Sequence, residues 1–283
     1  MTFDNNENAC IDFLQEVPYI TYPVLSKLPF LRHGFTTKLG GVSSDMFATM
    51  NLGSETSPYQ DDPANIEENY RRIARSIGFD VNSVVVSLQV HKTNILKVDK
   101  KDCGKGLFVP RDFDEIDGLI TNTPNVTLVT KYADCVPLYF IDPVKKAIGL
   151  THSGWRGTVK KIGKITVEEL QKQFGSNPED IIAVVGPSIC KDCYEIDGDA
   201  VTEFIKTFPD YQKERILLTK DNGKYLCDLW AANRSVLAEA GLRVENIHIS
   251  GVCTSCNSDW LFSHRKTQGK RGSLAAFLML KED

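Results

Sequence analysis

Apolar residues recur at helical spacing in four segments of the chain. The longest of these patterns covers residues 63–78, where Pro63 suits a first helical turn and Gly78 suits a C-terminal stop. Its apolar side chains would share one face of the helix: Ile66, Tyr70, Ile73 and Ile77. The same reasoning predicts three further helices, over residues 158–173, 201–208 and 229–240.

Short runs of β-branched and apolar residues between these helices predict strands. They cover residues 83–90, 125–130, 136–141, 147–151, 181–185, 247–250 and 274–280. Only a turn-forming stretch with Asp142 and Pro143 separates the third run from the fourth, so these two runs predict an antiparallel β-hairpin. Because a hairpin argues against a purely parallel sheet, we expect an α+β fold with mixed and antiparallel sheets covered by helices.

The pattern continues along the chain without a linker. No internal repeat, low-complexity tract or Pro/Gly/Ser-rich stretch interrupts it, and 283 residues suffice for one large core. We therefore expect a single domain over residues 1–283, with residues 1–15 as a flexible N-terminus.

Composition and charge narrow the class of protein. The chain is 42% hydrophobic and 25% charged, which is ordinary for a globular protein. Its net charge of -4 gives no basic surplus for binding a phosphate backbone, so nucleic acid is not expected as a partner. No apolar run approaches the ~20 residues that span a bilayer, and the first ten residues lack the features of a signal peptide. We expect a cytoplasmic protein without membrane contact.

Three potential metal ligands stand at the ends of predicted strands. His91 follows the run 83–90, Cys135 precedes the hairpin and His152 follows its second strand. The hairpin would bring Cys135 close to His152, whereas only tertiary structure can add His91. Two His and one Cys hold zinc with a fourth position open, as in catalytic zinc sites. The spacing alone leaves ordinary packed residues as an equal alternative.

The same three residues are compatible with other functions. Two His and one Cys also describe a blue-copper site, but five histidines in the whole chain are few for a multicopper oxidase. Cys135 and His152 could instead form the nucleophile and base of a cysteine hydrolase. A structural zinc module, with four protein ligands, is the alternative without catalysis.

Two Cys-x-x-Cys pairs offer a second set of thiols. Cys190 and Cys193 form one pair, and Cys253 and Cys256 form the other. Their spacing suits a four-cysteine structural zinc site, while buried thiols without metal are the plainer interpretation.

Several segments resemble one known family, and the resemblance covers nearly the whole chain. The chain is similar to the laccase-domain, YfiH-like proteins, which carry a legacy polyphenol-oxidase label and are regarded as purine nucleoside phosphorylases. Most of the resemblance is carried by HGFTTKLGGVS (33–43), MNLG (50–53), DDPANIEENYRR (61–72), QVHKT (89–93), ADCVP (133–137), THSGWRGT (151–158), GPSICKDCYEI (186–196) and CTSCNSDWLFSHRKTQGKRGSLAAFLML (253–280).

The resemblance implies a fold, a metal and an activity. It implies a layered α/β/β/α domain in which His91, Cys135 and His152 hold a catalytic zinc ion, with copper as the alternative metal. The implied reaction is cleavage of purine nucleosides, including methylthioadenosine, by phosphate, together with deamination of adenosine. Some relatives are linked to editing of cell-wall precursors, which would suit a hydrolase. A monomer or a homodimer is expected.

Six further residues are candidates for this chemistry. Asp134, beside the metal-site cysteine, is predicted to move protons or to orient a neighbouring group. Arg156, placed just before a predicted helix, and Arg265 are predicted to bind phosphate, with surface ion pairs as the plainer alternative. The predicted contacts to the nucleoside come from three more side chains: Asn51, Gln89 and Trp155.

Overall fold

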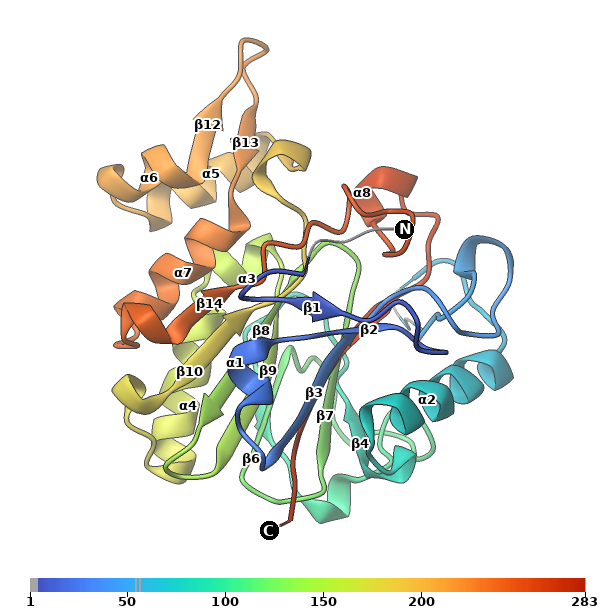
Figure 1. Cartoon of the computed structure of the whole chain (residues 1–283). Coiled ribbons are helices and arrows are strands. Elements are labelled where there is room, and N and C mark those ends of the chain that lie inside the picture. Colours follow the sequence, from blue (N-terminus) through green and yellow to red (C-terminus); the bar gives the residue numbers. More distant parts are fainter. Residues whose placement is uncertain (1–4, 54, 56, 283) are drawn as a thin grey trace.

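Two six-stranded β-sheets packed face to face form the centre of the protein (Figure 1). The computed structural model describes residues 5–53, 55 and 57–282. The first sheet contains, in spatial order, β1 (Cys10–Ile11), β2 (Tyr19–Thr21), β3 (Leu31–Thr36), β15 (Leu274–Leu280), β7 (Thr127–Tyr132) and β4 (Val84–Val86). The second contains β14 (Ile247–Ile249), β10 (Ile182–Val185), β8 (Val136–Asp142), β9 (Ala147–Ser153), β6 (Gly118–Thr121) and β5 (Ile95–Lys97).

Both sheets mix antiparallel and parallel pairs. One parallel pair joins β4 to β7 in the first sheet, and two others join β10 to β14 and β5 to β6 in the second. A small antiparallel sheet of β11 (Glu195–Ile196), β13 (Tyr225–Cys227) and β12 (Leu217–Thr219) projects beyond the end of the two large sheets (Figure 1). The expectation of mixed and antiparallel sheets is confirmed.

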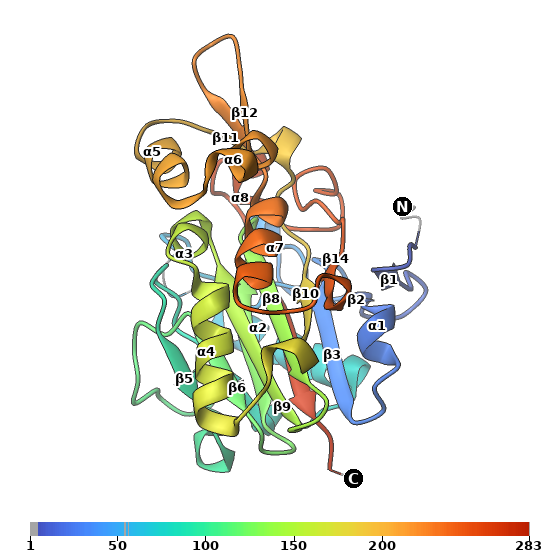
Figure 2. The same ribbon diagram turned by 90° about the vertical axis from the view of Figure 1, so that its left-hand side faces the viewer.

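Helices cover the outer faces of the two large sheets. Helix α2 (Pro63–Ile77) packs on the first sheet, while α4 (Ile162–Phe174) and α7 (Leu229–Glu239) pack on the second (Figure 2). The implied order of layers, α/β/β/α, is therefore present. The remaining helices are short or lie near the small sheet: α1 (Pro23–Ser26), α3 (Trp155–Val159), α5 (Gly198–Thr207), α6 (Asp210–Ile216) and α8 (His264–Thr267). No helix in the described chain is both long enough and apolar enough to cross a membrane.

Helix α2 begins and ends where its sequence predicts. The Asp62 side chain accepts a hydrogen bond from the Ala64 amide at the first turn, and Gly78 adopts a left-handed conformation with φ 87° at the C-terminus. Its buried face packs with β4, β7 and β15 in one apolar cluster that includes Tyr70 and Ile73. Burial of this face, rather than helix propensity alone, holds α2 on the sheet.

The predicted helix over residues 158–173 is wrong at its first turns. The chain forms α3 and α4 instead, and Lys161 between them has a left-handed backbone with φ 58°. Arg156 therefore lies inside the short helix α3 and not just before a helix. The spacing of apolar residues does not reveal that a single residue adopts a non-helical backbone conformation.

The predicted strand over residues 83–90 is also too long. Pairing with β7 ends at Val86, and the following residues form a loop that carries His91. The predicted flexible segment 1–15 lies partly outside the described residues, and within it Cys10 and Ile11 pair with β2. The strands β1, β2, β3, β5 and β6 and the small sheet had no prediction, since their runs are short or contain polar residues.

Candidate metal centre and pocket

The β8–β9 hairpin places Cys135 next to His152. The two strands pair with Val136 opposite Ser153 and Pro137 opposite His152. Cys135 directly precedes β8, as predicted, while β9 continues two residues further than predicted and contains His152. The predicted hairpin is confirmed, and it positions two of the three candidate ligands.

His91 joins them from the loop after β4. Its Nε2 lies 3.8 Å from the Cys135 Sγ, and its ring meets the His152 ring edge to face with centroids 4.8 Å apart. The ligand atoms of all three residues lie within 4.8 Å of one another. The side chains that the sequence places far apart therefore converge on one point.

The Asp117 carboxylate, which the sequence reasoning missed, holds this arrangement together. Asp117 is completely buried just before β6 and accepts a hydrogen bond of 2.8 Å from His152 Nδ1. It also accepts hydrogen bonds from the amides of Val90, His91 and Lys92 at 2.9–3.1 Å. These amides stabilise the left-handed backbone of His91, whose φ is 62°.

The hydrogen bond to Asp117 selects the free nitrogen of His152. With Nδ1 donating to the carboxylate, Nε2 is left to face Cys135 and His91. A carboxylate that orients a histidine in this way is characteristic of metal-ligating imidazoles. A single buried aspartate before a strand has no distinctive sequence pattern, which explains why it was missed.

The charges at this point favour ionised groups. Burial raises the pKa of the Cys135 thiol, but the adjacent His152 and His91 outweigh it and bring that pKa down to about 6. Burial lowers the pKa of His152, but Cys135 and Asp117 outweigh it and raise that pKa to about 9. Burial also raises the pKa of Asp117, whereas the hydrogen bonds from His152 and the backbone amides bring it below its usual range. Without a metal, these directions favour a thiolate–imidazolium pair. Metal binding would use the thiolate and would release the proton from His152 Nε2.

A glycine leaves room for the ligands. A Cβ atom on Gly154 would lie 2.8 Å from His91 Cδ2 and 3.2 Å from the Cys135 Sγ. The Gly154 backbone, with φ -71° and ψ 176°, does not itself require glycine. The absence of a side chain is therefore required by the convergence of the ligands. One thiolate and two imidazoles, one of them oriented by a carboxylate, fit a transition-metal ion.

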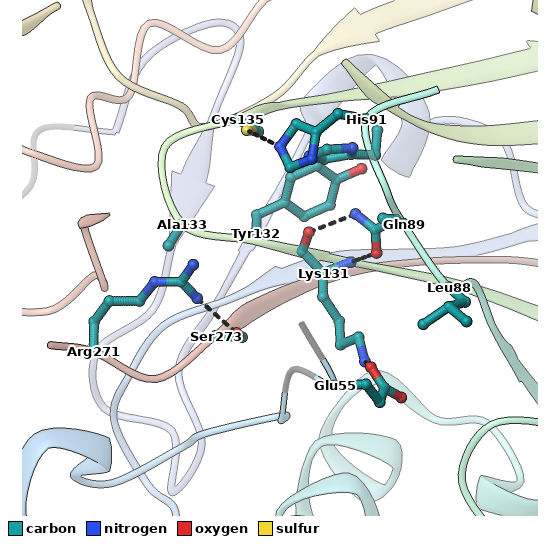
Figure 3. Close-up of a pocket in the computed structure, with 11 residues that line it drawn as sticks. Glu55, Leu88, Gln89, His91, Lys131, Tyr132, Ala133, Cys135, Arg271 and Ser273 are labelled. Atoms are coloured by element: carbon teal, nitrogen blue, oxygen red, sulfur yellow. Dashed lines mark hydrogen bonds and ion pairs between the residues drawn. The ribbon is translucent and has the colours of Figure 1, made fainter. Parts of the chain in front are cut away.

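The candidate ligands lie at one end of an open pocket of about 480 Å³ (Figure 3). Tyr132 packs beside His152, with ring centroids 5.5 Å apart, and its hydroxyl group donates to the Thr151 carbonyl. The lining consists of Glu55, Leu88, Gln89, His91, Lys131, Tyr132, Ala133, Cys135, His152, Arg271 and Ser273.

Arg271 supplies a cation that the sequence reasoning also missed. Figure 3 shows it across the pocket from Cys135 and His91. Its Nη1 donates to the Ser273 hydroxyl group at 2.9 Å and to the Gly272 carbonyl at 3.2 Å, and it forms no ion pair with a carboxylate among the described residues. Burial lowers the pKa of this guanidinium. A partly buried cation without a neutralising carboxylate is suited to an anionic ligand.

The other cation of the pocket is already neutralised. Lys131 is paired with Glu55, which also accepts a hydrogen bond of 2.8 Å from Arg111. Burial raises the pKa of Glu55, but Lys131 and Arg111 outweigh it and lower that pKa to about 2. Glu55 therefore offsets the charge of Lys131, while Arg111, which shares the same carboxylate, leaves one net positive charge behind this wall.

The predicted phosphate ligands lie away from the pocket lining. Arg156 is exposed, and its guanidinium stacks over the Trp155 ring at 4.3 Å from the centroid. Arg265 donates to the Glu195 carbonyl at 2.9 Å and lies over the Tyr194 ring. The roles of Arg156, Trp155 and Arg265 stay predictions.

Asp134 connects the metal-site segment to two other loops. Its carboxylate accepts hydrogen bonds of 2.6 Å from the Thr254 hydroxyl group and from the Arg265 amide. It is nearly buried and has a left-handed backbone with φ 84°. These contacts correspond to the orienting role in the sequence prediction, and a direct part in proton transfer stays a prediction.

Asn51 and Gln89 both use their amide groups to bind the protein itself. Asn51 accepts from the amides of Ser273 and Gly53 and donates to Asp61. Gln89 lines the pocket, where its side chain pairs with the backbone N–H and C=O of Lys131 at 2.8 and 2.7 Å. Their predicted contacts to a nucleoside stay predictions.

Comparison with known proteins places this fold and site in a family. A family model described as multi-copper polyphenol oxidoreductase laccase matches residues 32–281. The chain belongs to this laccase-domain, YfiH-like family. The structure of the Bacillus licheniformis hypothetical protein YfiH superposes with a TM-score of 0.88 at 34% identity, covering 96% of this chain and 99% of that protein.

Two curated relatives carry the names of enzymes. Purine nucleoside phosphorylase YlmD of Bacillus subtilis is 40% identical over 253 residues, which make up 88% of each chain. Adenosine deaminase RL5, from an unknown prokaryotic organism, is 32% identical over 255 residues, covering 86% of this chain and 93% of the relative. The predicted family is therefore confirmed, and the names of its members support an enzyme of this kind.

Proposed function

We propose that this protein is a zinc-dependent purine nucleoside phosphorylase that also deaminates adenosine. The observation that carries the proposal is one pocket with two kinds of group: His91, Cys135 and His152 converge at one end, and the unpaired cation of Arg271 lies across from them. The 40% identity to a protein named purine nucleoside phosphorylase supports the choice of substrate.

The proposed phosphorolysis exchanges one bond at the sugar for another. The bond between C1′ of the ribose and the purine nitrogen breaks, its electron pair stays on the purine, and a phosphate oxygen forms the new bond to C1′. Arg271 holds the phosphate dianion, because a guanidinium offers a fork of donors to two of its oxygens. The purine takes up a proton as it leaves, and no covalent enzyme intermediate is required.

The proposed deamination uses the metal end of the pocket. Water adds to the purine ring of adenosine and ammonia leaves, so inosine is the product. A bound zinc ion supplies Lewis acidity at this position. Asp117 orients His152 through a hydrogen bond, and Gly154 leaves space for His91 and Cys135. The Tyr132 ring packs beside His152.

The ligand inventory supports zinc over a multicopper centre. Among the described residues, His/Cys/Asp/Glu side chains form only two groups with metal-binding spacing, and only the group at the pocket contains histidine. His33 is buried at a distance from that group and accepts a hydrogen bond from the Tyr22 amide. A trinuclear copper cluster needs more imidazoles than these.

A cysteine hydrolase is the second candidate, and one observation favours it. The Cys135 thiol contacts both imidazoles, which is also the arrangement of an activated nucleophile and its base. Chelation separates the two functions. The proposed phosphorylase loses activity when the metal is removed and regains it with zinc, whereas a nucleophile would keep its activity after chelation and lose it on alkylation.

The deciding experiment is a nucleoside assay of metal-quantified protein. Adenosine is supplied with and without phosphate, and adenine and inosine are measured separately. We expect adenine only with phosphate, inosine in both conditions, and neither product from Cys135→Ala. Cys103→Ala is the control, because Cys103 is a half-buried thiol outside both groups of candidate ligands. Zinc-loaded wild-type protein without nucleoside turnover would overturn the proposal.

Arg271→Gln tests the phosphate site separately. This change removes the cation and keeps a hydrogen-bond donor of similar reach. We expect the KM for phosphate to rise about tenfold or more, because a charge-assisted hydrogen bond is lost, while deamination changes little. Arg243→Gln is the control, since Arg243 forms an exposed ion pair with Glu179 at the surface. An unchanged phosphate KM would exclude Arg271 as the anion ligand.

A further inference from the structure

Four cysteines gather at a second place in the fold, outside the pocket. The parallel strands β10 and β14 are continued beyond their carboxyl ends by a bridge between Ser188 and Cys253. The loop that follows each of these two strands contains one Cys-x-x-Cys sequence. The neighbouring paths of the two connections therefore bring four thiols together: Cys190, Cys193, Cys253 and Cys256.

The distances between the sulfurs match a tetrahedral metal site. The Cys193 and Cys256 Sγ atoms are 3.5 Å apart, and those of Cys190 and Cys256 are 3.9 Å apart. All four Sγ atoms lie within 4.8 Å of one another. A zinc ion at about 2.3 Å from each sulfur sets neighbouring sulfurs ~3.8 Å apart, whereas a disulfide needs about 2.05 Å.

Backbone amides point at one of the sulfurs. The N–H groups of Cys190 and Cys256 both donate to the Cys253 Sγ, with N–S distances of 3.3 and 3.4 Å. Backbone N–H groups that donate to a sulfur orient it, as groups behind a metal ligand do. Cys253 is also the most deeply buried of the four, with 5% of its surface exposed.

We infer that Cys190, Cys193, Cys253 and Cys256 bind a structural zinc ion, separate from the metal at the pocket. Four protein ligands complete a tetrahedral shell, so this ion has no open position for a substrate. Zinc fits because it has no redox chemistry and takes tetrathiolate geometry without strain.

The second site fixes a residue beside the first. Ile189, next to Cys190, donates its amide to the Asp134 carbonyl at 3.0 Å. Thr254, next to Cys253, donates its hydroxyl group to the Asp134 carboxylate at 2.6 Å. Both connections that the zinc ion joins therefore hold Asp134, which directly precedes the Cys135 ligand. The ion therefore fixes the position of the segment that leads into β8.

Metal content and thiol protection test this inference without an activity assay. Protein purified under reducing conditions is analysed for zinc as wild type, Cys135→Ala, Cys256→Ser and the double variant. We expect about two ions per chain in wild type, one in each single variant and none in the double variant. Cys256 is exposed, so its replacement by serine removes little packing. Cys10→Ser is the control, because Cys10 belongs to neither group of ligands.

A second measurement uses absorption spectroscopy and thiol alkylation. Replacement of zinc by cobalt(II) should give the absorption of a tetrahedral tetrathiolate centre, and Cys256→Ser should lose that spectrum. The four thiols should also resist alkylation until a chelator is added. One zinc ion per wild-type chain with a loaded pocket site, a disulfide within the cluster, bound iron, or free alkylation of zinc-loaded protein would each overturn the inference. Since no readout is catalytic, failure of the proposed function would leave this result standing.

Discussion

The two clusters of potential metal ligands differ in every property that determines what a metal ion does. The pocket cluster has three ligands of two kinds, oriented by a buried carboxylate and placed at the end of an open pocket. The cysteine cluster has four ligands of one kind, arranged around two loops, and no member of it lines that pocket. With a metal bound, the first arrangement would leave a coordination position free, and the second would fill the shell.

If both clusters bind metal as proposed, the comparison indicates that ligand number and surroundings separate a catalytic site from a structural one. Cysteine sulfur is a candidate ligand in both clusters. Cys135 has histidine partners, a glycine that keeps space beside it and a carboxylate behind one imidazole. In the cysteine cluster, two backbone amides donate to the Cys253 sulfur, and the neighbouring residues Ile189 and Thr254 hydrogen-bond to Asp134.

The largest expected effect comes from Gly154→Ala. The added methyl group would meet His91 Cδ2 at 2.8 Å and the Cys135 Sγ at 3.2 Å, so the three ligands can no longer converge. We expect zinc to fall by about one ion per chain and nucleoside turnover to become undetectable, while the cysteine cluster keeps its metal. Metal analysis and the product assay measure this outcome.

Gly157→Ala is the matched control for this change. A Cβ at Gly157 would have as its nearest neighbour the Ile162 Cγ2 at 3.3 Å, and it would meet the His152 carbonyl oxygen at an ordinary contact distance of 3.6 Å without touching a ligand side chain. We expect this variant to keep both metal ions. If Gly154→Ala retained full zinc content, the close approach at Gly154 would have no part in ligand geometry.

Asp117→Asn should weaken the pocket cluster without emptying it. The asparagine keeps the size of the side chain but loses the charge and one acceptor, so His152 and the amides of the His91 loop are held less firmly. We expect zinc affinity at the pocket to fall about 10–100-fold, the range for residues that orient metal ligands. Competition with a coloured chelator measures it, with the cysteine cluster as an internal reference.

Asp142→Asn controls for the loss of any buried carboxylate. Asp142 is also buried and accepts hydrogen bonds from the Val144 and Lys145 amides, at the far end of the hairpin. Its replacement should leave zinc affinity unchanged. Equal effects of the two substitutions on zinc affinity would argue against an orienting role for Asp117.

The smallest expected effect tests the connection between the two clusters. Thr254→Val removes the hydroxyl group that donates to Asp134, and Asp134 keeps its bond from the Arg265 amide. We expect the free energy of unfolding to fall on the order of 1.5 kcal/mol, as for a hydrogen bond to a charged group. Both zinc ions should be retained, and kcat should fall a few-fold. Urea denaturation and the product assay measure these changes.

Thr202→Val provides the comparison at the surface. Thr202 is exposed and donates only to the Gly198 carbonyl within α5, so its replacement should change stability by about 0.5 kcal/mol or less. An effect of Thr254→Val no larger than this would show that the two clusters are not connected through Asp134.

Periodicity predicted the long elements of the fold. The helix at 63–77 and the hairpin of β8 and β9 agree with the sequence because each has a strong period and clear turn residues. The break at Lys161 and the early end of β4 at Val86 depend on single backbone conformations and on strand pairing. These are decided by tertiary contacts that local sequence does not contain.

The convergence of the three candidate ligands was predictable from the sequence, and the residues that support them were not. The role of the three candidates as metal ligands stays a prediction. His91, Cys135 and His152 have side chains with distinctive chemistry at strand ends, so their convergence could be anticipated. Asp117 and Arg271 are common residue types, and the neighbouring sequence does not mark either of them as functional. Asp117 is distinguished by its burial and by a partner that is distant in the chain, His152, and Arg271 by its place in the pocket lining.

The β8–β9 hairpin also has a consequence for the order of assembly. Cys135 and His152 meet as soon as neighbouring strands pair, a local event with little cost in loop closure. His91 lies 44 residues from Cys135 along the chain and arrives only when the sheets have packed. If these residues bind a metal as proposed, a folding chain would offer two ligands first, and His91 would complete the site last.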